Sequence, residues 1–445
     1  MSYLEAVRYL GSLVNYEKFS TYPYTEALNL KRARGFLDSI HNPQAPLRCI
    51  HVAGTKGKGS TSAFIAYILR ESGFKAGLYT SPHLADFRER IRILSPGNRN
   101  QKIKADFEGM IPRLKLAGLV NRLKSAIEKY NRASIYGPLT FFEAYTALAF
   151  VYFNQEKVDF AVLETGLGGR LDATNVVKPK VCVITPISYE HTDKLGYTLK
   201  EIASEKAGII KKGSVVISAP QAKEAMAIIR NKCKKEKAEL LVVGKDIKYS
   251  GTEERFRVST PAAEYKNLKI TLHGAHQVMN AACALAAVEA MAAYGVKAGI
   301  DSITKGLYNT LWPGRCEVIA REPLIVLDGA QNAASAGVLK EAVKAKFRYR
   351  RLILMLGVSN DKDIKGIAGE LYDLADTVIL TKAKSLRAAD PANLAGYFNK
   401  KNQYITHNVA EAKMLAKELA KKEDLILITG SLFVVGEARE SGIGL

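Results

Sequence analysis

A glycine-rich turn between an apolar run and a helical pattern constrains the fold of this chain most. The apolar run Arg48–Ala53 leads into Gly54-Thr55-Lys56-Gly57-Lys58-Gly59-Ser60-Thr61, and a helical pattern extends from Ser60 to Glu71. Glycines let backbone N–H groups turn toward an anion, and the first turn of a helix adds its positive dipole. This order predicts a phosphate site between a strand and a helix of an α/β domain.

The loop departs from the strict P-loop pattern, which has four residues between its glycines and a hydroxyl residue directly after the lysine. Here two residues separate the first two glycines, and Gly59 follows Lys58. Lys58 is still placed to reach the outer phosphates of a nucleotide, and Ser60 or Thr61 to meet a metal ion. A tight glycine turn beneath a helix, without a ligand, is the alternative interpretation.

Short β-branched runs alternate with longer helical patterns, which predicts parallel βαβ units. The strands expected first are Arg48–Ala53, Ala76–Thr80, Val158–Glu164, Val181–Ile187 and Ser214–Ser218. The helices expected between or after them are Ser60–Glu71, Thr140–Phe153, Thr198–Ile209 and Gln221–Lys235. Short antiparallel strands are expected from Lys245 to Leu272, followed by an alanine-rich helix from about His276 to Tyr294.

A second α/β set begins after Trp312-Pro313-Gly314-Arg315. Its expected strands are Leu324–Asp328, Arg351–Gly357, Thr377–Thr381 and Leu425–Thr429. Because the Pro313-Gly314 dipeptide breaks regular structure, it marks the expected boundary and hinge. The sequence therefore predicts a larger domain at 1–313, with a parallel-rich central sheet, and a smaller one at 314–445.

Composition limits the classes of protein to be considered. The chain has 445 residues, of which 47% are hydrophobic and 24% charged, as in ordinary globular proteins. No apolar run reaches the roughly 20 residues that span a bilayer, and charges interrupt the N-terminal stretch, so we expect a cytoplasmic protein. The five cysteines show no metal-type spacing and are expected to be buried free thiols.

The formal charge of +21 has more than one interpretation. Nucleic-acid binding is one, but the basic residues are spread along the chain with acids between them, and no binding motif accompanies them. A positive field that attracts nucleotides and polycarboxylates, or a solvated basic surface, explains the balance as well. We expect small-molecule substrates, no nucleic acid, no membrane partner and a monomer.

Three polar residues follow predicted strands, at the edge where open parallel sheets bind ligands. Glu164 ends one strand, Ser81 follows the strand Ala76–Thr80, and His191 comes after the strand ending at Ile187. Beside a phosphate loop they predict a two-metal Mg²⁺ site, because Mg²⁺ is usually held by few protein groups plus phosphates. Taken singly, they are equally a turn serine, a helix-cap carboxylate and a surface histidine.

Further motifs follow one another along nearly the whole chain. They are His51-Val52-Ala53-Gly54-Thr55-Lys56-Gly57-Lys58-Gly59-Ser60, Thr80-Ser81-Pro82-His83-Leu84, Glu89-Arg90-Ile91, Leu139-Thr140-Phe141-Phe142-Glu143, Leu163-Glu164-Thr165-Gly166-Leu167-Gly168-Gly169-Arg170-Leu171-Asp172-Ala173-Thr174-Asn175, His191-Thr192-Asp193, Glu205-Lys206-Ala207-Gly208-Ile209-Ile210, Trp312-Pro313-Gly314-Arg315, Asp328-Gly329-Ala330, Asp361-Lys362-Asp363 and Thr429-Gly430-Ser431-Leu432. In this order they resemble the folylpolyglutamate synthase/dihydrofolate synthase family, a branch of the Mur ligases, including its bifunctional members.

The resemblance implies a P-loop, Mur-ligase-like N-terminal domain with a pteroate pocket and a smaller, Rossmann-like C-terminal glutamate ligase domain. It implies ATP-dependent ligation of L-glutamate to dihydropteroate, to the γ-carboxylate of a folate, or to both, through an acyl phosphate. This reaction belongs to folate biosynthesis and polyglutamylation. The implied cofactors are ATP, two Mg²⁺ ions and a monovalent cation.

The resemblance also implies a role for individual residues. ATP would be bound by Thr55, Lys56, Gly57, Lys58, Gly59, Ser60, Asn280, Arg315 and Asp328. Mg²⁺ would be held by Ser81, Glu164, His191 and Lys206, the last after carbamylation by CO₂, and Lys58, His191 and Lys206 would take part in catalysis. The pteroate pocket would include Thr140, Phe141, Phe142, Glu143, Leu171, Asp172 and Ala173, with Ser431 near the incoming glutamate.

Several of these residues also have structural interpretations. Thr140 and Glu143 fit the two ends of a helix capping box. Phe142 is suited to stack on a pterin ring or to pack in the core. Asp172 is suited to accept hydrogen bonds from a pterin or to sit in a turn. Lys206, taken alone, is a lysine favoured by the negative end of a helix dipole.

Two departures from the family pattern affect the site. Lys56 stands where the family usually has Asn, which adds a charge to the phosphate loop. Gln331 and Ala333 stand in Asp-Gly-Ala-Gln-Asn-Ala, where the family usually reads Asp-Gly-Ala-His-Asn-Pro, and this change affects the glutamate side of the site.

Four rival functions are weighed against the folate ligase. A Mur-type cell-wall ligase would act on a uridine-nucleotide peptide, whereas the stretch at 166–175 favours a folate. A P-loop switch or motor would hydrolyse a nucleotide without acid or amino acid. A nicotinamide oxidoreductase is prompted by Gly166-Leu167-Gly168-Gly169, which lacks the spacing of the dinucleotide fingerprint. A non-catalytic nucleic-acid binder is prompted only by the charge.

Overall fold

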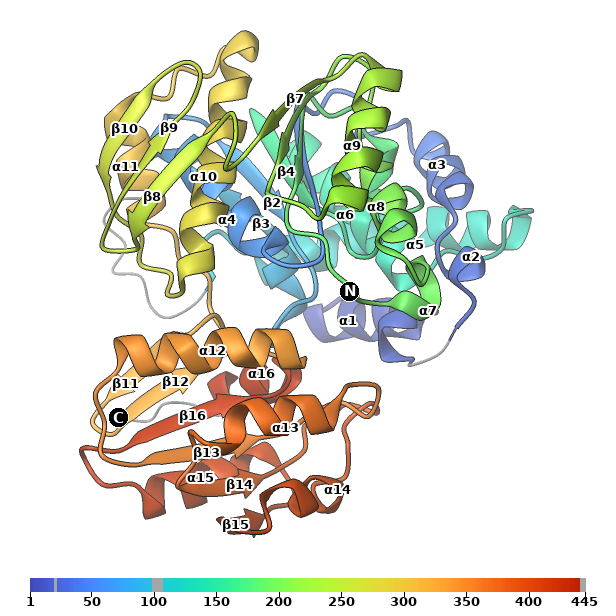
Figure 1. Cartoon of the computed structure of the whole chain (residues 1–445). Coiled ribbons are helices and arrows are strands. Elements are labelled where there is room, and N and C mark those ends of the chain that lie inside the picture. The colour runs from blue at the N-terminus through green and yellow to red at the C-terminus, as the bar shows by residue number, and fades with distance from the viewer. Residues whose placement is uncertain (20–21, 98–106, 441–445) are drawn as a thin grey trace.

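The computed structural model describes residues 1–19, 22–97 and 107–440. Two α/β bodies lie one above the other, each built around its own sheet (Figure 1). The chain passes from the larger to the smaller body between α11 (Ile300–Tyr308) and β11 (Glu317–Arg321). Helices α12 (Ala333–Lys346) and α16 (Leu432–Glu440) of the smaller body lie on the side that faces the larger one.

The larger body contains a seven-stranded sheet in the order β3-β2-β4-β1-β5-β6-β7. Its strands are β1 Cys49–Ala53, β2 Ala76–Tyr79, β3 Ile91–Leu94, β4 Phe160–Glu164, β5 Val181–Ile184, β6 Val215–Ser218 and β7 Glu239–Val242. Neighbouring strands are parallel except β3, which runs antiparallel to β2 at one edge. The five expected strands are present, and the sequence analysis missed the two edge strands.

Helices cover both faces of this sheet. They are α1 Tyr3–Ser12, α2 Tyr24–Ala27, α3 Leu30–Ser39, α4 Lys58–Glu71, α5 Arg113–Ala133, α6 Phe141–Gln155, α7 Thr192–Leu195, α8 Leu199–Ala207, α9 Lys223–Glu236, α10 Ala275–Ala290 and α11. Helix α4 packs between the sheet and helices α10 and α11, and nearly all of its side chains are buried. Helices α1, α3, α5 and α6 share a second core on the opposite face, and α8 and α9 cover β5 and β6.

The expected antiparallel insertion is also present. Strands β8 (Lys248–Thr252), β9 (Arg255–Ser259) and β10 (Glu264–Leu268) form a separate sheet in the order β10-β9-β8. Its apolar side chains join the core of α4 and α10. The insertion therefore supports the outer side of α10, whose first turn reaches the nucleotide side of the site described below.

The smaller body contains a six-stranded sheet in the order β11-β12-β16-β13-β14-β15. Besides β11 its strands are β12 Leu324–Leu327, β13 Leu352–Leu356, β14 Thr377–Leu380, β15 Asn402–Ile405 and β16 Leu425–Thr429. All neighbours are parallel except the edge pair β11 and β12. Its other helices are α13 Ile364–Tyr372, α14 Ala392–Ala395 and α15 Val409–Leu419.

The predicted fold class is confirmed: two α/β bodies with parallel-rich sheets. All five cysteines are buried free thiols, as expected. Among the described residues, the search for a helix both long and apolar enough to cross a membrane finds none.

Candidate active site

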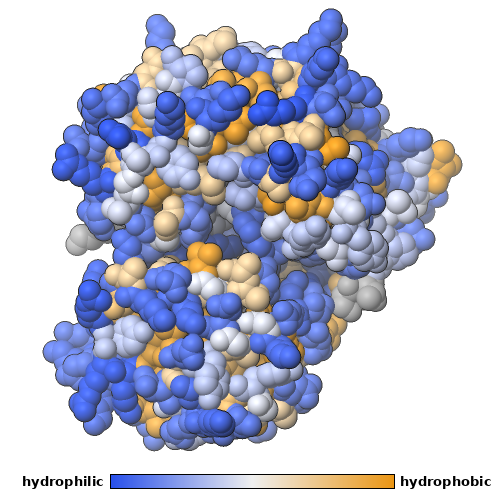
Figure 2. All heavy atoms as spheres, viewed as in Figure 1, coloured by the Kyte–Doolittle hydropathy of each residue, from blue (hydrophilic) through white to orange (hydrophobic). Residues whose placement is uncertain are grey.

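A cavity of about 470 Å³ lies between the two bodies. One wall is formed by the phosphate loop, by residues that follow β2, β4 and β5, and by the first turn of α10; the other is formed by residues after β12 and by α12. Figure 2 shows a crevice between the bodies on the viewed face. The carboxyl ends of strands from both sheets therefore open into one space, where parallel α/β sheets bind their ligands.

The backbone of the phosphate loop is shaped to receive an anion. Gly54 and Gly57 have φ angles of 151° and 81°, and a Cβ atom at Gly57 would lie 2.5 Å from Oδ1 of Asn280. Gly57 is also the N-cap of α4 and has no side-chain cap, so the N–H groups at the start of this helix are left for a ligand. The loop from Thr55 to Ser60 lines the cavity.

Hydrogen bonds hold the first part of this loop, Thr55 and Lys56, to the segment that follows β5. The N–H groups of Thr55 and Lys56 donate to the carbonyl oxygen of Pro186, at 2.9 and 3.3 Å. The Thr55 hydroxyl donates to the carbonyl oxygen of Ser188 at 3.1 Å, and Ser188 N–H donates back to it. The phosphate loop and the segment that carries His191 are therefore held together.

Ser81 and Glu164 are brought together by the pairing of β2 with β4. Both residues line the cavity, and Ser81 N–H donates to Oε2 of Glu164 at 3.2 Å. Burial raises the pKa of Glu164 to about 7, against the opposing effect of the Lys58 ammonium. A buried carboxylate of this kind favours a position beside a cation.

His191 lies on the third side of the same space. It occupies the left-handed region with a φ of 51°, directly before α7, and its side chain lines the cavity. The imidazole is open to the cavity yet enclosed between the two bodies, and this enclosure lowers its pKa below the ordinary value. A neutral imidazole is the form that can bind a metal ion.

These three residues fit a Mg²⁺ ion better than a fully caged metal. In the part of the chain that the structure describes, no group of three or more His, Cys, Asp or Glu side chains is placed to hold a metal. A carboxylate, a hydroxyl and an imidazole beside a phosphate loop suit Mg²⁺, which keeps water and phosphate oxygens among its ligands.

Lys206 lies behind the phosphate loop and does not line the cavity. Its side chain is buried, and its ammonium donates to the carbonyl oxygen of Gly54 at 2.8 Å. Burial, together with the nearby Lys58 ammonium, lowers the pKa of Lys206 to about 7. The residue thus contacts the backbone of the loop without lining the cavity.

The remaining predicted nucleotide residues, from both bodies, also line the cavity. Asn280 comes from α10, and Arg315 and Asp328 come from the start of the smaller body. The Asp328 carboxylate accepts hydrogen bonds from the N–H groups of Cys316 and Ala330, both at 2.8 Å. Apolar residues of α10 and α12 lie at this side of the cavity and provide a surface for a nucleobase: Met279, Val338 and Leu339.

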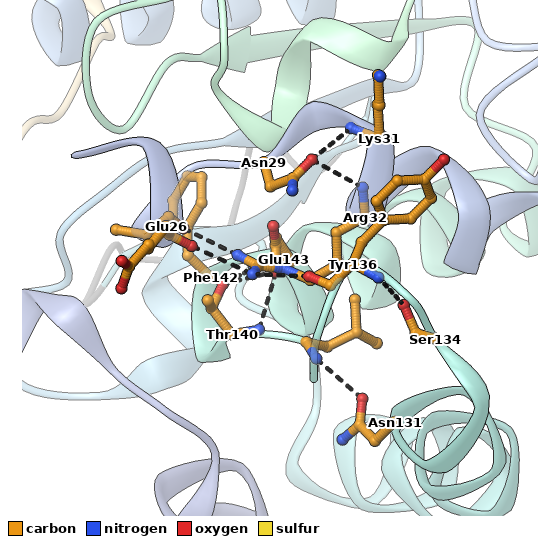
Figure 3. Close-up of polar contacts among 12 residues, drawn as sticks. Glu26, Asn29, Lys31, Arg32, Asn131, Ser134, Tyr136, Thr140, Phe142 and Glu143 are labelled. Carbon is orange, nitrogen blue, oxygen red and sulfur yellow. Dashed lines mark hydrogen bonds and ion pairs between the residues drawn. The ribbon is translucent and has the colours of Figure 1, made fainter. Parts of the chain in front are cut away.

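The residues at the start of α6 lie outside the cavity lining. Thr140 and Glu143 form the expected capping box, and the Glu143 carboxylate also accepts from Arg32 Nε at 2.7 Å (Figure 3). Phe141 is fully buried in the core. Phe142 is the member closest to the site, because its ring packs directly behind Gly166, which does line the cavity.

The second predicted pteroate stretch is folded onto itself. The Asp172 carboxylate is fully buried and accepts from the N–H groups of Gly166 and Leu167 at 2.9 and 3.0 Å. Its other oxygen accepts from the N–H and hydroxyl of Thr174. Neither Leu171 nor the buried Ala173 lines the cavity. Asp172 therefore shapes the loop behind Gly166, and its contact with a pterin stays a prediction.

Ser431 lies at the carboxyl end of β16, beside the cavity residue Leu432. It is buried, and its hydroxyl accepts from Phe433 N–H at 3.1 Å. Ser431 thus lies at the carboxyl end of a central strand of the smaller sheet, where the cavity opens, but it does not line the cavity.

The sequence analysis did not assign two charged residues that the structure places at the site. Glu190 lines the cavity and pairs with Lys56, and Glu89 accepts from the N–H groups of Leu84, Ala85 and Asp86 in the segment after Ser81. Glu190 could have been predicted from the sequence, because it directly precedes His191, a predicted metal ligand. For Glu89 the motif Glu89-Arg90-Ile91 was the available signal, although no role was predicted from it.

Two protein-family models match successive parts of the chain. The Mur ligase middle domain matches residues 116–288, and the Mur ligase glutamate ligase domain matches residues 314–432. With a phosphate loop and a second α/β body facing one cavity, these matches define the class: the chain contains the middle and glutamate ligase domains of the Mur ligases.

Individual relatives identify a family within the Mur ligases. The chain is 32% identical to the dihydrofolate synthase/folylpolyglutamate synthase of Bacillus subtilis, over 92% of this chain and 94% of that protein. The solved structure of E. coli FolC in complex with DHPP and ADP has a TM-score of 0.84 at 30% identity, and the match covers 99% of this chain and 97% of that one. The chain belongs to the folylpolyglutamate synthase/dihydrofolate synthase family.

Some relatives are longer. The chain is 37% identical to a probable bifunctional folylpolyglutamate synthase/dihydropteroate synthase of Haloferax volcanii, over 99% of this chain. It spans only 50% of the length of that protein.

Proposed function

We propose that this chain is an ADP-forming ligase that joins L-glutamate to dihydropteroate, to the γ-carboxylate of a folate, or to both. The observation that carries the proposal is that Lys58 and Glu164, from separate strand ends, line one cavity between the two bodies. The names of the relatives support the substrates, and the E. coli structure contains DHPP and ADP. The chain would serve folate biosynthesis and polyglutamylation.

The first step activates the acid. A carboxylate is a poor acyl donor, because its leaving group would be oxide. In the proposed step a carboxylate oxygen attacks the γ-phosphorus of ATP, the bond to the β-phosphate oxygen breaks, and ADP leaves. Lys58 and the N–H groups at the start of α4 position the transferring phosphoryl group and balance its charge.

The second step forms the amide. The amino group of glutamate attacks the acyl carbon of the acyl phosphate, and the tetrahedral intermediate loses a proton and expels phosphate. Enclosure between the two bodies keeps water from the acyl phosphate. We place the hinge of this closure at Pro313-Gly314 and the two domains at 1–313 and 314–445.

For the metal site we propose that Ser81, Glu164 and His191 hold Mg²⁺, with two ions present during the reaction. Bound Mg²⁺ would supply charge neutralisation for the phosphoryl group. Nucleotide contacts are assigned to Thr55–Ser60, Asn280, Arg315 and Asp328, and a monovalent cation is expected nearby. We assign the pteroate contacts to the stretches at 140–143 and 171–173. We assign a contact with the incoming glutamate to Ser431.

We further propose that Lys206 is carbamylated. Its nitrogen would add to CO₂ with release of a proton, which converts a buried cation beneath the phosphate loop into an oxygen ligand. Lys206→Ala should lose activity, short carboxylic acids should restore part of it, and ¹³CO₂ should give a carbamate NMR signal in the unsubstituted protein. Absence of both the rescue and the signal would refute this assignment.

We also propose that the chain acts as a cytoplasmic monomer, which light scattering after gel filtration would test. The function itself is tested by ADP release with dihydropteroate and, separately, with a reduced folate, each with L-glutamate. Release is expected to require both acid and amino acid. Equal ADP release without them would indicate a simple nucleotide hydrolase and contradict the proposal.

A further inference from the structure

Glu190 makes a contact that links the phosphate loop to the smaller domain. Its Oε1 atom accepts a hydrogen bond from the Lys56 ammonium at 2.5 Å and another from Nδ2 of Asn332 at 3.4 Å. Lys56 belongs to the phosphate loop and Asn332 precedes α12 in the smaller domain. One carboxylate oxygen thus touches both walls of the active-site cavity.

Each partner of Glu190 is anchored on its own side. Lys56 N–H donates to Pro186 O, which fixes the loop backbone beside Glu190. Asn332 is the N-cap of α12, and its Oδ1 accepts from Ser335 N–H at 2.9 Å. The side-chain oxygen of Asn332 therefore serves α12, while its amide nitrogen reaches across to Glu190.

The two departures from the family pattern meet at this contact. Lys56 adds a second cation to a loop that already carries Lys58, and Gln331 and Ala333 flank Asn332. Two ammonium groups on one short loop repel each other unless an anion balances them. Glu190 supplies this balance from within the cavity wall, so the extra lysine has a fixed counter-charge.

We infer that Glu190 is a positioning residue that couples closure of the two domains to the placement of Lys56 beside the triphosphate of ATP. This inference rests on the proposed function. When the domains close, Asn332 orients the Glu190 carboxylate, and that carboxylate holds the Lys56 ammonium against the cavity wall. When the domains separate, Glu190 loses one of its two partners, and Lys56 is held less firmly.

The competing explanation is an ordinary surface ion pair. The Lys56 side chain is 38% exposed and that of Glu190 19%, and ion pairs at the surface contribute little to stability. Such a pair would not couple to a residue of the other domain. A charge exchange across the contact distinguishes the two explanations, because only a direct contact allows one substitution to repair another.

The first test exchanges the charge between positions 190 and 332. Asn332→Asp keeps a good N-cap on α12 but sets two carboxylates against each other, so KM for ATP should rise about tenfold. Adding Glu190→Gln should bring KM back to within about threefold of the single variant Glu190→Gln, because an amide again faces a carboxylate and only the loss of the Lys56 partner remains. An unchanged KM in Asn332→Asp, or a double variant no better than this single one, would overturn the inference.

The second test concerns Lys56. Lys56→Gln and Glu190→Gln should each weaken binding of the ATP analogue AMPPCP. The double variant should bind AMPPCP with about the same affinity as the single variant that binds it less tightly, since both substitutions remove the same ion pair. Fully additive losses would contradict the inference. Glu236→Gln breaks a comparable ion pair with Lys232 within α9 and serves as the matched control.

The binding measurement needs neither acid nor glutamate, so it separates the two proposals. If AMPPCP binding follows the expected pattern but no ADP is released with folate substrates, the substrate assignment fails and the coupling stands. If ADP is released normally but the variants behave independently, the coupling fails and the substrate assignment stands.

Discussion

At the scale of single residues, the charges around the phosphate loop set the chemistry that the site can perform. After burial, the Lys58 ammonium is the strongest influence on the pKa of both Glu164 and Lys206. A lysine in this position can neutralise a phosphoryl group and is itself balanced by the acidic groups that would hold the metal. Lys58 is therefore expected to be indispensable for the reaction but not for folding.

Lys58→Ala should reduce ADP release by at least about a hundredfold, because it removes the cation nearest the transferring phosphoryl group. The measurement is ADP release with dihydropteroate and glutamate at saturating ATP. Lys200→Ala, at an exposed lysine of α8, is the control and should leave the rate unchanged. Full turnover in Lys58→Ala would contradict the assignment of the phosphate site.

A buried histidine outside the cavity predicts how stability depends on pH. His51 in β1 is fully buried, and burial lowers its pKa to about 3, whereas the ordinary value is 6.5. The unfolded chain therefore binds the proton more readily than the folded one. The stability due to the neutral ring is fully present above pH 6.5 and is lost as the pH falls toward 3.

Between about pH 6.5 and pH 5 this residue should remove roughly 2 kcal/mol of unfolding free energy. His51→Gln removes the titration and leaves an amide to meet the hydroxyl of Thr174, which His51 Nε2 contacts at 2.8 Å. Urea unfolding at several pH values should show a smaller loss of stability in the variant over this range. Equal losses in both proteins would show that His51 does not titrate on unfolding.

Twelve of the predicted residues line the cavity: Thr55, Lys56, Gly57, Lys58, Gly59, Ser60, Ser81, Glu164, His191, Asn280, Arg315 and Asp328. The loop residues, Ser81, Glu164 and His191 follow recognisable strands, whereas Asn280, Arg315 and Asp328 were predicted from the family resemblance. Sequence reasoning could not tell which way a loop side chain turns. Asp172 bonds to its own loop and Lys206 to Gly54 O, and both orientations depend on contacts that only the folded chain forms.

At the scale of elements, a buried ion pair fixes the start of α6. Arg32 in α3 and Glu143 have side chains only 7% and 2% exposed, and Arg32 also donates to the carbonyl oxygen of Ala27. The pair ties α2 and α3 to the capping box of α6 (Figure 3). The capping box was predictable because its residues lie three apart, whereas Arg32 lies far away in sequence.

Arg32→Met should destabilise the larger domain by about 3–5 kcal/mol, because it leaves the Glu143 carboxylate buried without its charged partner. Urea unfolding provides the measurement. Lys115→Met, which breaks the more exposed pair with Glu156, is the matched control and should cost about 0.5 kcal/mol or less. A loss below about 1 kcal/mol in Arg32→Met would show that the pair does not hold these helices.

The strands of the two large sheets that the sequence analysis missed share one property. Strands β3, β7, β11 and β15 lie at the edges of the two large sheets. Edge strands have a neighbour on one side only, so they need less apolar and β-branched sequence than the central strands. Strand β15, Asn402–Ile405, has no buried residue at all. In β15 the pattern that predicted the inner strands was therefore absent.

At the scale of the whole molecule, the two domains meet closely beside the proposed metal site. A Cβ atom at Gly436 of α16 would lie 2.1 Å from the carbonyl oxygen of Leu84, three residues after Ser81. The Leu84 side chain also approaches Gly314 at the predicted hinge. Two glycines of the smaller domain thus accommodate the segment that carries a predicted metal ligand.

Gly436→Ala should force this contact apart and raise KM for ATP, with a loss of about 1–3 kcal/mol in stability from overpacking. Steady-state kinetics and thermal unfolding measure the two effects. Gly369→Ala in α13 is the matched control, since nothing lies within 4 Å of its added Cβ atom, and it should be neutral or slightly stabilising. Unchanged kinetics in Gly436→Ala would mean that this contact is not part of the closed state.

The central claim is that the loop around Lys58 and the carboxylate of Glu164 hold the same metal-bound triphosphate. A crystal structure of the chain with Mn²⁺ and AMPPCP tests it directly, because Mn²⁺ is located by its anomalous scattering. We expect a Mn²⁺ peak between Glu164 and the phosphates of AMPPCP, and we expect the phosphates to accept hydrogen bonds from the N–H groups at the start of α4. A nucleotide bound away from this loop, or a metal without Glu164 as a ligand, would contradict it.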